Sequence, residues 1–293
     1  MNRRSFISSA ILLPISVNAM NKELNNLASS DGNTTRMPVL FVGHGSPMNA
    51  ISENEFVENW RNLGKTLPRP KAILCISAHW ETRGTFVTAM PKPPTIHDFG
   101  GFPKALFDIQ YPAPGSPEFA RETKRIVTKT EVGLDEKWGL DHGAWSVIRS
   151  MYPLADIPIF EMSLDYYQSP QYHYDLAKEL ASLRGKGVLI IGSGNIVHNL
   201  RMVAWDKVDE PEYGFDWALH ANDTIKQLIL ANKHKELINF STLGREVQQA
   251  IPTPEHYLPL LYALALKKEN EQLTIFNDKA VMGSLTMTSI KIG

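Results

Sequence analysis

Three apolar runs in this sequence each lead to a histidine, and this repetition constrains the fold more than any other feature. VLFV precedes the turn GHGSP, which carries His44; AILCISA runs directly into His79; GVLII is followed by GSGN and then by His198. Unbroken apolar runs are typical of strands buried on both faces of a parallel sheet. Ligands bind beyond the carboxyl ends of such strands. The sequence therefore predicts an α/β fold in which a central, mostly parallel or mixed sheet is flanked by helices, with a metal site at the carboxyl ends of its strands.

The segments between these runs complete the expected fold. Periodicity, capping residues and prolines predict helices over 53–67, 116–128, 146–151, 172–184 and 215–231, and further strands over 86–89, 157–164, 272–276 and 284–292. Thr253 is the expected cap of a last helix running to about residue 266, with Pro254 at its first position and His256 in its first turn. Without repeats or linkers, 37–293 is expected to be a single catalytic domain.

The N-terminus has the pattern of an export signal rather than of a folded element. Arg3 and Arg4 precede a short apolar stretch, and small residues end at Ala19, which predicts a signal peptide over 1–19 of the twin-arginine type. The polar segment 20–36 is expected to be a flexible leader. A periplasmic or exported location follows, or a cytoplasmic one if the signal is not functional. The apolar stretch is too short to span a membrane, and no other segment resembles a span.

Charge and cysteine content narrow the classes of partner. The chain has 30 basic and 31 acidic residues, a net charge of −1, and no basic stripe, which argues against nucleic-acid binding. A single cysteine, Cys75, lies inside an apolar run, so an intramolecular disulfide is excluded and a buried thiol is expected. The expected assembly is a monomer or a small homo-oligomer.

Five histidines form the candidate site. Besides His44, His79 and His198, these are His142 in GLDHGAWSV and His256 in TPEHYLPLL. Three or four neutral imidazoles suit zinc, iron, copper or nickel, and the absence of cysteine argues against a structural zinc site. Aromatic residues near these histidines suggest a place for a flat aromatic molecule. His97 and Asp98, in a proline-rich loop, either contact substrate or support the site, or else form only a local turn. His173, His220 and His234 are expected on solvated helix faces.

The sequence resembles the class III extradiol ring-cleavage dioxygenases, in particular the branch containing 4,5-DOPA extradiol dioxygenases. The resemblance spans 38–293 and depends on the order and spacing of LFVGHGSPM, ISAHWETRG, PPTIHDFGGFP, YPAPGSPE, GLDHGAWSV, IPIFEMSLD, GSGNIVHNLR and TPEHYLPLLYAL.

The resemblance implies one divalent metal ion per chain, Fe(II) for dioxygenase activity with Zn(II) as an alternative bound form. It implies His44 and His79 as ligands and His256 as the third, although a carboxylate holds that place in protocatechuate-type relatives and Glu255 is adjacent. His198 matches the active-site base, and in zinc-occupied relatives it also approaches the metal. His142 matches a histidine that contacts dioxygen or substrate. The implied partners are a DOPA-like catechol and O2, with His97 and Asp98 as substrate-binding residues.

Three other functions fit the same histidines. Zn(II) there would activate water in a hydrolase. A strand followed by His-Gly-Ser also suits a chelatase-like protein that inserts metal into a tetrapyrrole. A purely structural metal site is the third. Only the dioxygenase requires iron, a catechol and oxygen together, so oxygen uptake distinguishes it.

Overall fold

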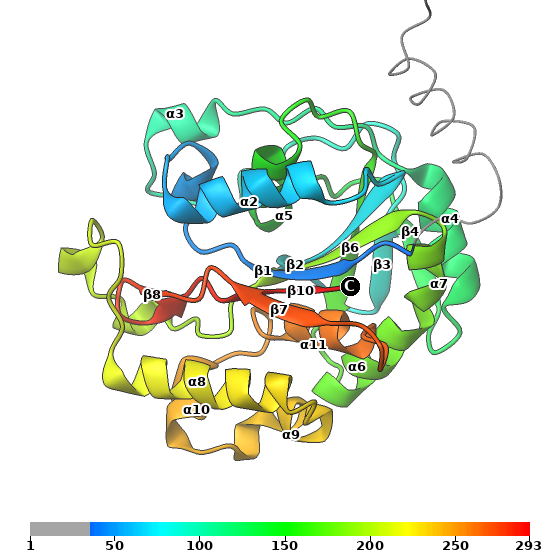
Figure 1. Ribbon diagram of the computed structural model, residues 1–293. Coiled ribbons are helices and arrows are strands. Elements are labelled where there is room, and N and C mark those ends of the chain that lie inside the picture. Colours follow the sequence, from blue (N-terminus) through cyan, green and yellow to red (C-terminus); the bar gives the residue numbers. More distant parts are fainter. Residues whose placement is uncertain (1–35) are drawn as a thin grey trace, which may run out of the picture. The chain divides into compact units, whose positions relative to one another are not determined.

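A mixed sheet of eight strands runs through the middle of residues 36–293, the part of the chain that the computed structural model describes (Figure 1). The strand order is β4-β3-β5-β2-β6-β1-β10-β7. The strands are β1 (Val39–Gly43), β2 (Ala72–Thr82), β3 (Thr85–Thr88), β4 (Val132–Asp135), β5 (Ile159–Asp165), β6 (Val188–Gly194), β7 (Leu273–Phe276) and β10 (Ser289–Ile292). A separate short hairpin pairs β8 (Ala280–Val281) with β9 (Leu285–Thr286). The predicted signal peptide and all but the last residue of the predicted leader lie outside the described residues.

The four central strands are parallel, and their carboxyl ends meet at one edge. β5, β2, β6 and β1 are neighbours in that order, with β2 and β1 both pairing in parallel with β6. β10 and β7 add antiparallel strands beyond β1, and β3 pairs antiparallel with β5. The predicted α/β fold with a mixed central sheet is therefore confirmed. His44 follows β1, His79 lies in the last part of β2, and His198 follows β6.

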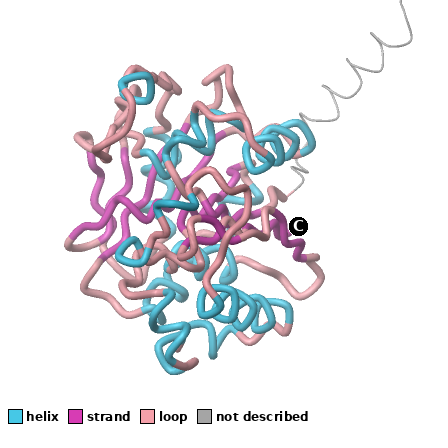
Figure 2. Tube along the Cα trace, turned by 90° about the vertical axis from the view of Figure 1, so that its left-hand side faces the viewer, coloured by secondary structure: helices cyan, strands magenta, loops and turns pink. Residues whose placement is uncertain are grey.

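Helices cover both faces of the sheet, as Figures 1 and 2 show. One face carries α2 (Glu55–Thr66), α3 (Lys104–Phe107), α5 (His142–Met151) and the 3-10 helix η1 (Pro47–Ala50). The other carries α4 (Pro117–Ile126), α6 (Pro170–Glu179), α7 (Ala181–Gly185), α8 (Asp216–Leu230), α9 (His234–Ile238), α10 (Arg245–Ala250) and α11 (Leu258–Ala265). Three more 3-10 helices are η2 (Leu200–Met202), η3 (Trp205–Lys207) and η4 (Phe240–Thr242).

Alternating residues of the central strands supply two separate cores. In β1, Val39 and Phe41 pack with the α11 side of the sheet, whereas Leu40 and Val42 pack with the α2 side. This explains the unbroken apolar runs, since both faces of each strand are buried. Cys75 belongs to the second core as a buried free thiol, as predicted.

Two expected helices have different bounds. α5 begins at His142 instead of residue 146, because Asp141 is its N-cap and accepts a hydrogen bond from the Ala144 amide at 3.1 Å. The expected helix 172–184 begins earlier, at Pro170, where Ser169 caps it, and divides into α6 and α7 near Leu180. The strand expected over 284–292 is interrupted between β9 and β10.

The expectation for His256 was wrong in one respect. α11 begins only at Leu258, and the preceding residues form a turn in which the Tyr257 and Leu258 amides both donate to the Pro254 carbonyl at 2.9 Å. His256 therefore lies in this turn and not in the first turn of the helix.

His173 is buried, contrary to the expected solvated position. It is fully shielded from solvent in α6, where its Nδ1 lies 3.0 Å from the Tyr262 hydroxyl. His234 is half-buried and hydrogen bonds to the Tyr174 hydroxyl at 2.7 Å, whereas His220 is exposed as expected. Within residues 36–293, no helix combines the length and the apolar character needed to cross a bilayer.

Candidate active site

His44 is held at the end of β1 by contacts with β6. Its backbone amide donates to the Gly194 carbonyl at 3.1 Å, and its Nδ1 lies 3.0 Å from the Ser193 hydroxyl. Ser193 donates its own proton to the Gly143 carbonyl at 2.6 Å, so its oxygen is left to accept from Nδ1–H. This assigns the His44 tautomer whose Nε2 carries a free lone pair.

His79 reaches the same place from β2. The pairing of β2 with β5 shifts register between Ile76 and Glu81, so the strand is irregular where it carries His79. The His79 amide donates to the Ser77 hydroxyl at 3.2 Å. Its Nδ1 lies 3.5 Å from a carboxylate oxygen of Asp98, and its Nε2 lies 3.1 Å from Nε2 of His44. Two imidazoles therefore present their Nε2 atoms to each other.

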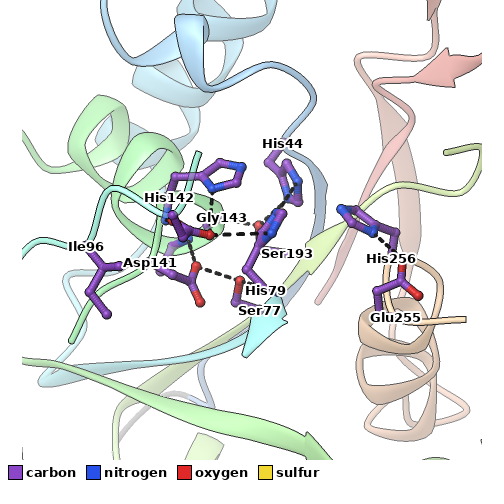
Figure 3. A network of polar contacts seen from close by, with 12 residues as sticks. His44, Ser77, His79, Ile96, Asp141, His142, Gly143, Ser193, Glu255 and His256 are labelled. Carbon is purple, nitrogen blue, oxygen red and sulfur yellow. Dashed lines mark hydrogen bonds and ion pairs between the residues drawn. The ribbon is translucent and has the colours of Figure 1, made fainter. Parts of the chain in front are cut away.

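His256 approaches from the other side of the site, on the turn before α11 (Figure 3). Its carbonyl accepts a hydrogen bond from the Asn195 amide at 2.9 Å, which attaches the turn to the end of β6. A Cβ atom on Gly194 would lie only 2.1 Å from that carbonyl oxygen, so this close approach requires glycine. Nδ1 of His256 lies 3.0 Å from a carboxylate oxygen of Glu255, whereas its buried Nε2 has no hydrogen-bond partner.

These three histidines form one group whose donor atoms all lie within 4.8 Å of one another. Burial is the main cause that lowers the pKa values of these histidines, and the neighbouring imidazoles are the second cause. The pKa values of His44 and His256 fall well below the usual value, and that of His79 falls to about 3. All three rings are therefore neutral near pH 7, as metal ligands must be. An unpartnered buried Nε2 and three neutral imidazoles fit a divalent metal ion.

Asp98 holds His142 beside this group. One Asp98 oxygen accepts from the His142 amide and the other lies near Nδ1 of the same residue, both at 2.9 Å. Burial opposes ionisation of Asp98, but the hydrogen bond to His142 and the nearby imidazoles lower its pKa overall. The His142 ring lies 3.9 Å from the His79 ring, centroid to centroid. Asp98 thus contacts two of the predicted site histidines.

His198 stacks on His256 and does not belong to the three-histidine group. The two rings are nearly parallel, with 3.5 Å between centroids. The donor atom of His198 groups instead with those of Glu255 and His256. Burial lowers the pKa of His198 to about 4, although the Glu255 charge opposes this shift. His198 is therefore neutral near pH 7 and able to accept a proton.

His97 lies among aromatic side chains. Its Nε2 is 3.0 Å from the Ile109 carbonyl, and its ring contacts those of Phe99, Phe107 and Trp145. Phe99 also meets the His142 ring edge to face, with 5.5 Å between centroids. The aromatic surroundings expected from the sequence are present on the His142 side of the site.

Sequence reasoning missed several residues that fix these histidines. Ser193 and Asn195 stood in the recognised GSGN turn but were given no role, although they bind His44 and the His256 turn. Ser77 and Asp141, which support His79 and α5, are ordinary residues in the sequence, and only the folded chain brings them together at 2.7 Å.

Comparison with known proteins agrees with this geometry. The family described as catalytic LigB subunit of aromatic ring-opening dioxygenase matches residues 35–288. A 4,5-DOPA dioxygenase extradiol from Escherichia coli (strain K12) is 47% identical over 269 residues, covering 89% of this chain and 96% of that protein. The protein of the same name from Beta vulgaris is 36% identical over 260 residues, covering 86% and 94%. An uncharacterized Escherichia coli K12 protein of known crystal structure aligns with a TM-score of 0.76 at 42% identity, covering 88% of this chain and 100% of that chain.

The fold and these matches define an extradiol aromatic ring-opening dioxygenase, an enzyme class that acts on an aromatic substrate with O2. The histidine cluster indicates that it holds a metal ion. Within that class the chain belongs to the LigB family. The predicted family and enzyme type are confirmed.

Proposed function

We propose that this dioxygenase opens the ring of a DOPA-like catechol, with one divalent metal ion held by His44, His79 and His256. The observation that carries the ligand assignment is the unpartnered, buried Nε2 of His256, which belongs to the same group as the facing Nε2 atoms of His44 and His79. Fe(II) is the proposed metal of the active enzyme and Zn(II) an alternative bound form. Bound Fe(II) supplies a redox-active centre through which a catechol and dioxygen exchange electrons. The names of the relatives support the choice of a DOPA-like substrate.

His198 is the proposed general base. Its neutral imidazole lies next to the ligand group, stacked on His256. A neutral imidazole in this position takes the proton of a catechol hydroxyl and so favours the catecholate form. The negative charge of the nearby Glu255 carboxylate stabilises the imidazolium that results, and for this reason it raises the pKa of His198 against the effect of burial.

His142 and the aromatic side chains are proposed to hold the substrate. Asp98 accepts one hydrogen bond from the His142 backbone amide and one from the ring Nδ1, so the ring keeps one orientation beside His79. The edge of Phe99 against His142 provides an apolar surface for a flat ring. Asp98 then acts by positioning His142, whereas His97 supports the aromatic cluster.

Oxygen uptake tests this proposal. Metal-free protein loaded with Fe(II) or with Zn(II) is given DOPA, other catechols and the matched monophenol tyrosine. We expect oxygen consumption and a ring-opened semialdehyde only with Fe(II) and a catechol. Activity of the zinc-loaded protein without oxygen consumption, or equal turnover of tyrosine, would contradict the proposal.

We also propose export by the twin-arginine route, with cleavage after residue 19, a leader over 20–36 and one catalytic domain over 37–293. The sequence features that support it are Arg3, Arg4 and the small residues before Ala19. Replacing both arginines with lysine should leave the full-length chain in the cytoplasm. An unprocessed cytoplasmic wild-type protein would show that the signal is not functional. Light scattering of the mature chain tests the expected monomer or small homo-oligomer.

A further inference from the structure

Two carboxyl side chains lie together in the protein core beneath the active site. Asp141 precedes α5 and Glu161 lies in β5, and neither is exposed to solvent. Glu161 Oε1 accepts a hydrogen bond from the Asp141 amide at 3.0 Å. Asp141 Oδ1 accepts from the Ser77 hydroxyl at 2.7 Å and from the Ala144 amide at 3.1 Å. One oxygen of each carboxyl is thus satisfied.

The remaining oxygen of each carboxyl has no donor. Asp141 Oδ2 and Glu161 Oε2 are both buried without a hydrogen-bond partner. A side-chain hydrogen bond between the two carboxyl groups, which raises the pKa of Glu161 and lowers that of Asp141, requires a proton on one of them. Among the described residues, neither carboxyl takes part in an ion pair with lysine, arginine or histidine. The titratable groups around the pair are Cys75, Asp98 and His142.

Two buried carboxylates side by side would be costly, because each loses its hydration and they repel each other. A single proton between them removes both problems. Burial is the main cause that raises the pKa of both side chains, and the Asp141 charge raises that of Glu161 further. The pKa of Glu161 is raised more than that of Asp141, so Glu161 is the side chain that holds the proton.

We infer that Glu161 is a neutral acid in the native protein, donates its proton from Oε2 to Asp141 Oδ2, and with Asp141 positions His79 and His142. This one proton gives both unpartnered oxygens a partner. The Asp141 carboxylate then connects the two histidines: it accepts from Ser77, whose hydroxyl oxygen receives the His79 amide, and it caps the helix whose first residue is His142. Glycine at position 143 leaves room for the hydrogen bond between Ser77 and Asp141, since a Cβ there would lie 2.5 Å from the Ser77 hydroxyl oxygen.

Infrared spectroscopy tests the proton directly and independently of any metal. The metal-free protein near pH 7 should show a carbonyl stretching band of a buried carboxylic acid. Glu161→Gln should remove that band while keeping the fold, because the amide N–H replaces the acid proton toward Asp141. The shared proton is refuted if the wild-type protein shows no carboxylic-acid band, or if the band persists unchanged in Glu161→Gln.

Zinc binding by the metal-free protein tests the positioning role, which rests on the proposed ligand His79. Glu161→Gln should bind Zn(II) within a few-fold of wild type, whereas Glu161→Met, of similar length but without a donor, should bind about 10-fold or more weakly. Ser77→Ala leaves the carboxyl pair intact but breaks its link to His79, and should weaken binding similarly even if Glu161→Met does not fold. Wild-type affinity in Ser77→Ala, or equal affinity in the Gln and Met variants, would overturn the positioning role. Failure of wild type to bind zinc would instead refute the proposed ligand set, and the infrared result would still stand.

Discussion

Removing the buried imidazole of His173 should make the stability of this protein less sensitive to acid. His173 lies in α6, where its Nδ1 is 3.0 Å from the Tyr262 hydroxyl and its Nε2 is 3.3 Å from the Asp165 carbonyl. Tyr172 packs against the same ring. Burial lowers the pKa of His173 from 6.5 to about 4, with the Asp165 contacts opposing the shift. The ring is therefore neutral in the folded protein near pH 7.

The size of the effect follows from the difference between the two states. In the unfolded chain His173 takes up a proton as the pH falls below 6.5, whereas in the folded protein it does so only near pH 4. Stability contributed by the neutral ring is thus complete above pH 6.5 and is lost as the pH falls toward 4. Between pH 7.5 and pH 5 the loss amounts to about 2 kcal/mol, at 1.36 kcal/mol for each pH unit of linkage.

Urea unfolding of the metal-free protein at pH 7.5 and pH 5 measures this loss. His173→Gln retains an amide donor and acceptor but does not titrate, so the decrease in unfolding free energy over this interval should be about 2 kcal/mol smaller than in wild type. The comparison isolates His173 from the other buried histidines, which remain in both proteins. His220→Gln is the matched control, because His220 is exposed on α8 and should leave the decrease unchanged.

The pH dependence of the unfolding free energy of His173→Gln tests whether the folded His173 is buried and neutral. If it equals that of wild type, the folded His173 is already protonated or is exposed in solution, and the burial argument fails. A Gln variant that is too unstable to measure can be replaced by His173→Asn, which tests the same loss of titration.

Three further predictions concern the active site. His256→Gln should lose the metal, whereas His198→Gln should keep most of it and lose oxygen uptake by about 10²–10⁴-fold; metal analysis of both variants checks this, and loss of metal from both would make His198 a fourth ligand. Gly194→Ala should destabilise the protein by about 1–3 kcal/mol and weaken zinc binding, because the added Cβ would lie 2.1 Å from the His256 carbonyl; wild-type zinc titration would show that this contact does not place the ligand. Asp98→Asn should lower kcat more than zinc affinity, because Asp98 contacts His142 at 2.9 Å and His79 only at 3.5 Å, and the reverse ranking would assign Asp98 mainly to His79.

The sequence was most informative where a local pattern determines the position of a residue. Apolar runs ending at glycine or histidine located β1, β2 and β6, and the rule for parallel strands placed His44 and His79 at one edge. It did not predict the strand order, since pairing β2 and β1 on either side of β6 depends on packing of the whole sheet.

Errors arose where distant contacts override a local pattern. Thr253 and Pro254 have the pattern of a helix start, but the His256 carbonyl is bonded to the Asn195 amide and the helix begins later. His173 lies among polar residues of α6, and only its contact with Tyr262, 89 positions away, shows that it faces the core. The pairing of Asp141 with Glu161 likewise cannot be inferred from either local sequence.

The placement of carboxylates has a consequence for the substrate. In the proposed site all three ligands are neutral imidazoles, so the charge of a divalent ion is not offset by the atoms that bind it. Glu255 and Asp98 instead lie on the outer Nδ1 side of His256 and His79, at 3.0 and 3.5 Å. There they increase the basicity of the imidazoles without occupying a ligand position. A catecholate, with two negative oxygens, then supplies the missing charge, and a monophenol supplies only half of it. This asymmetry is the electrostatic reason to expect that catechols, and not tyrosine, bind productively.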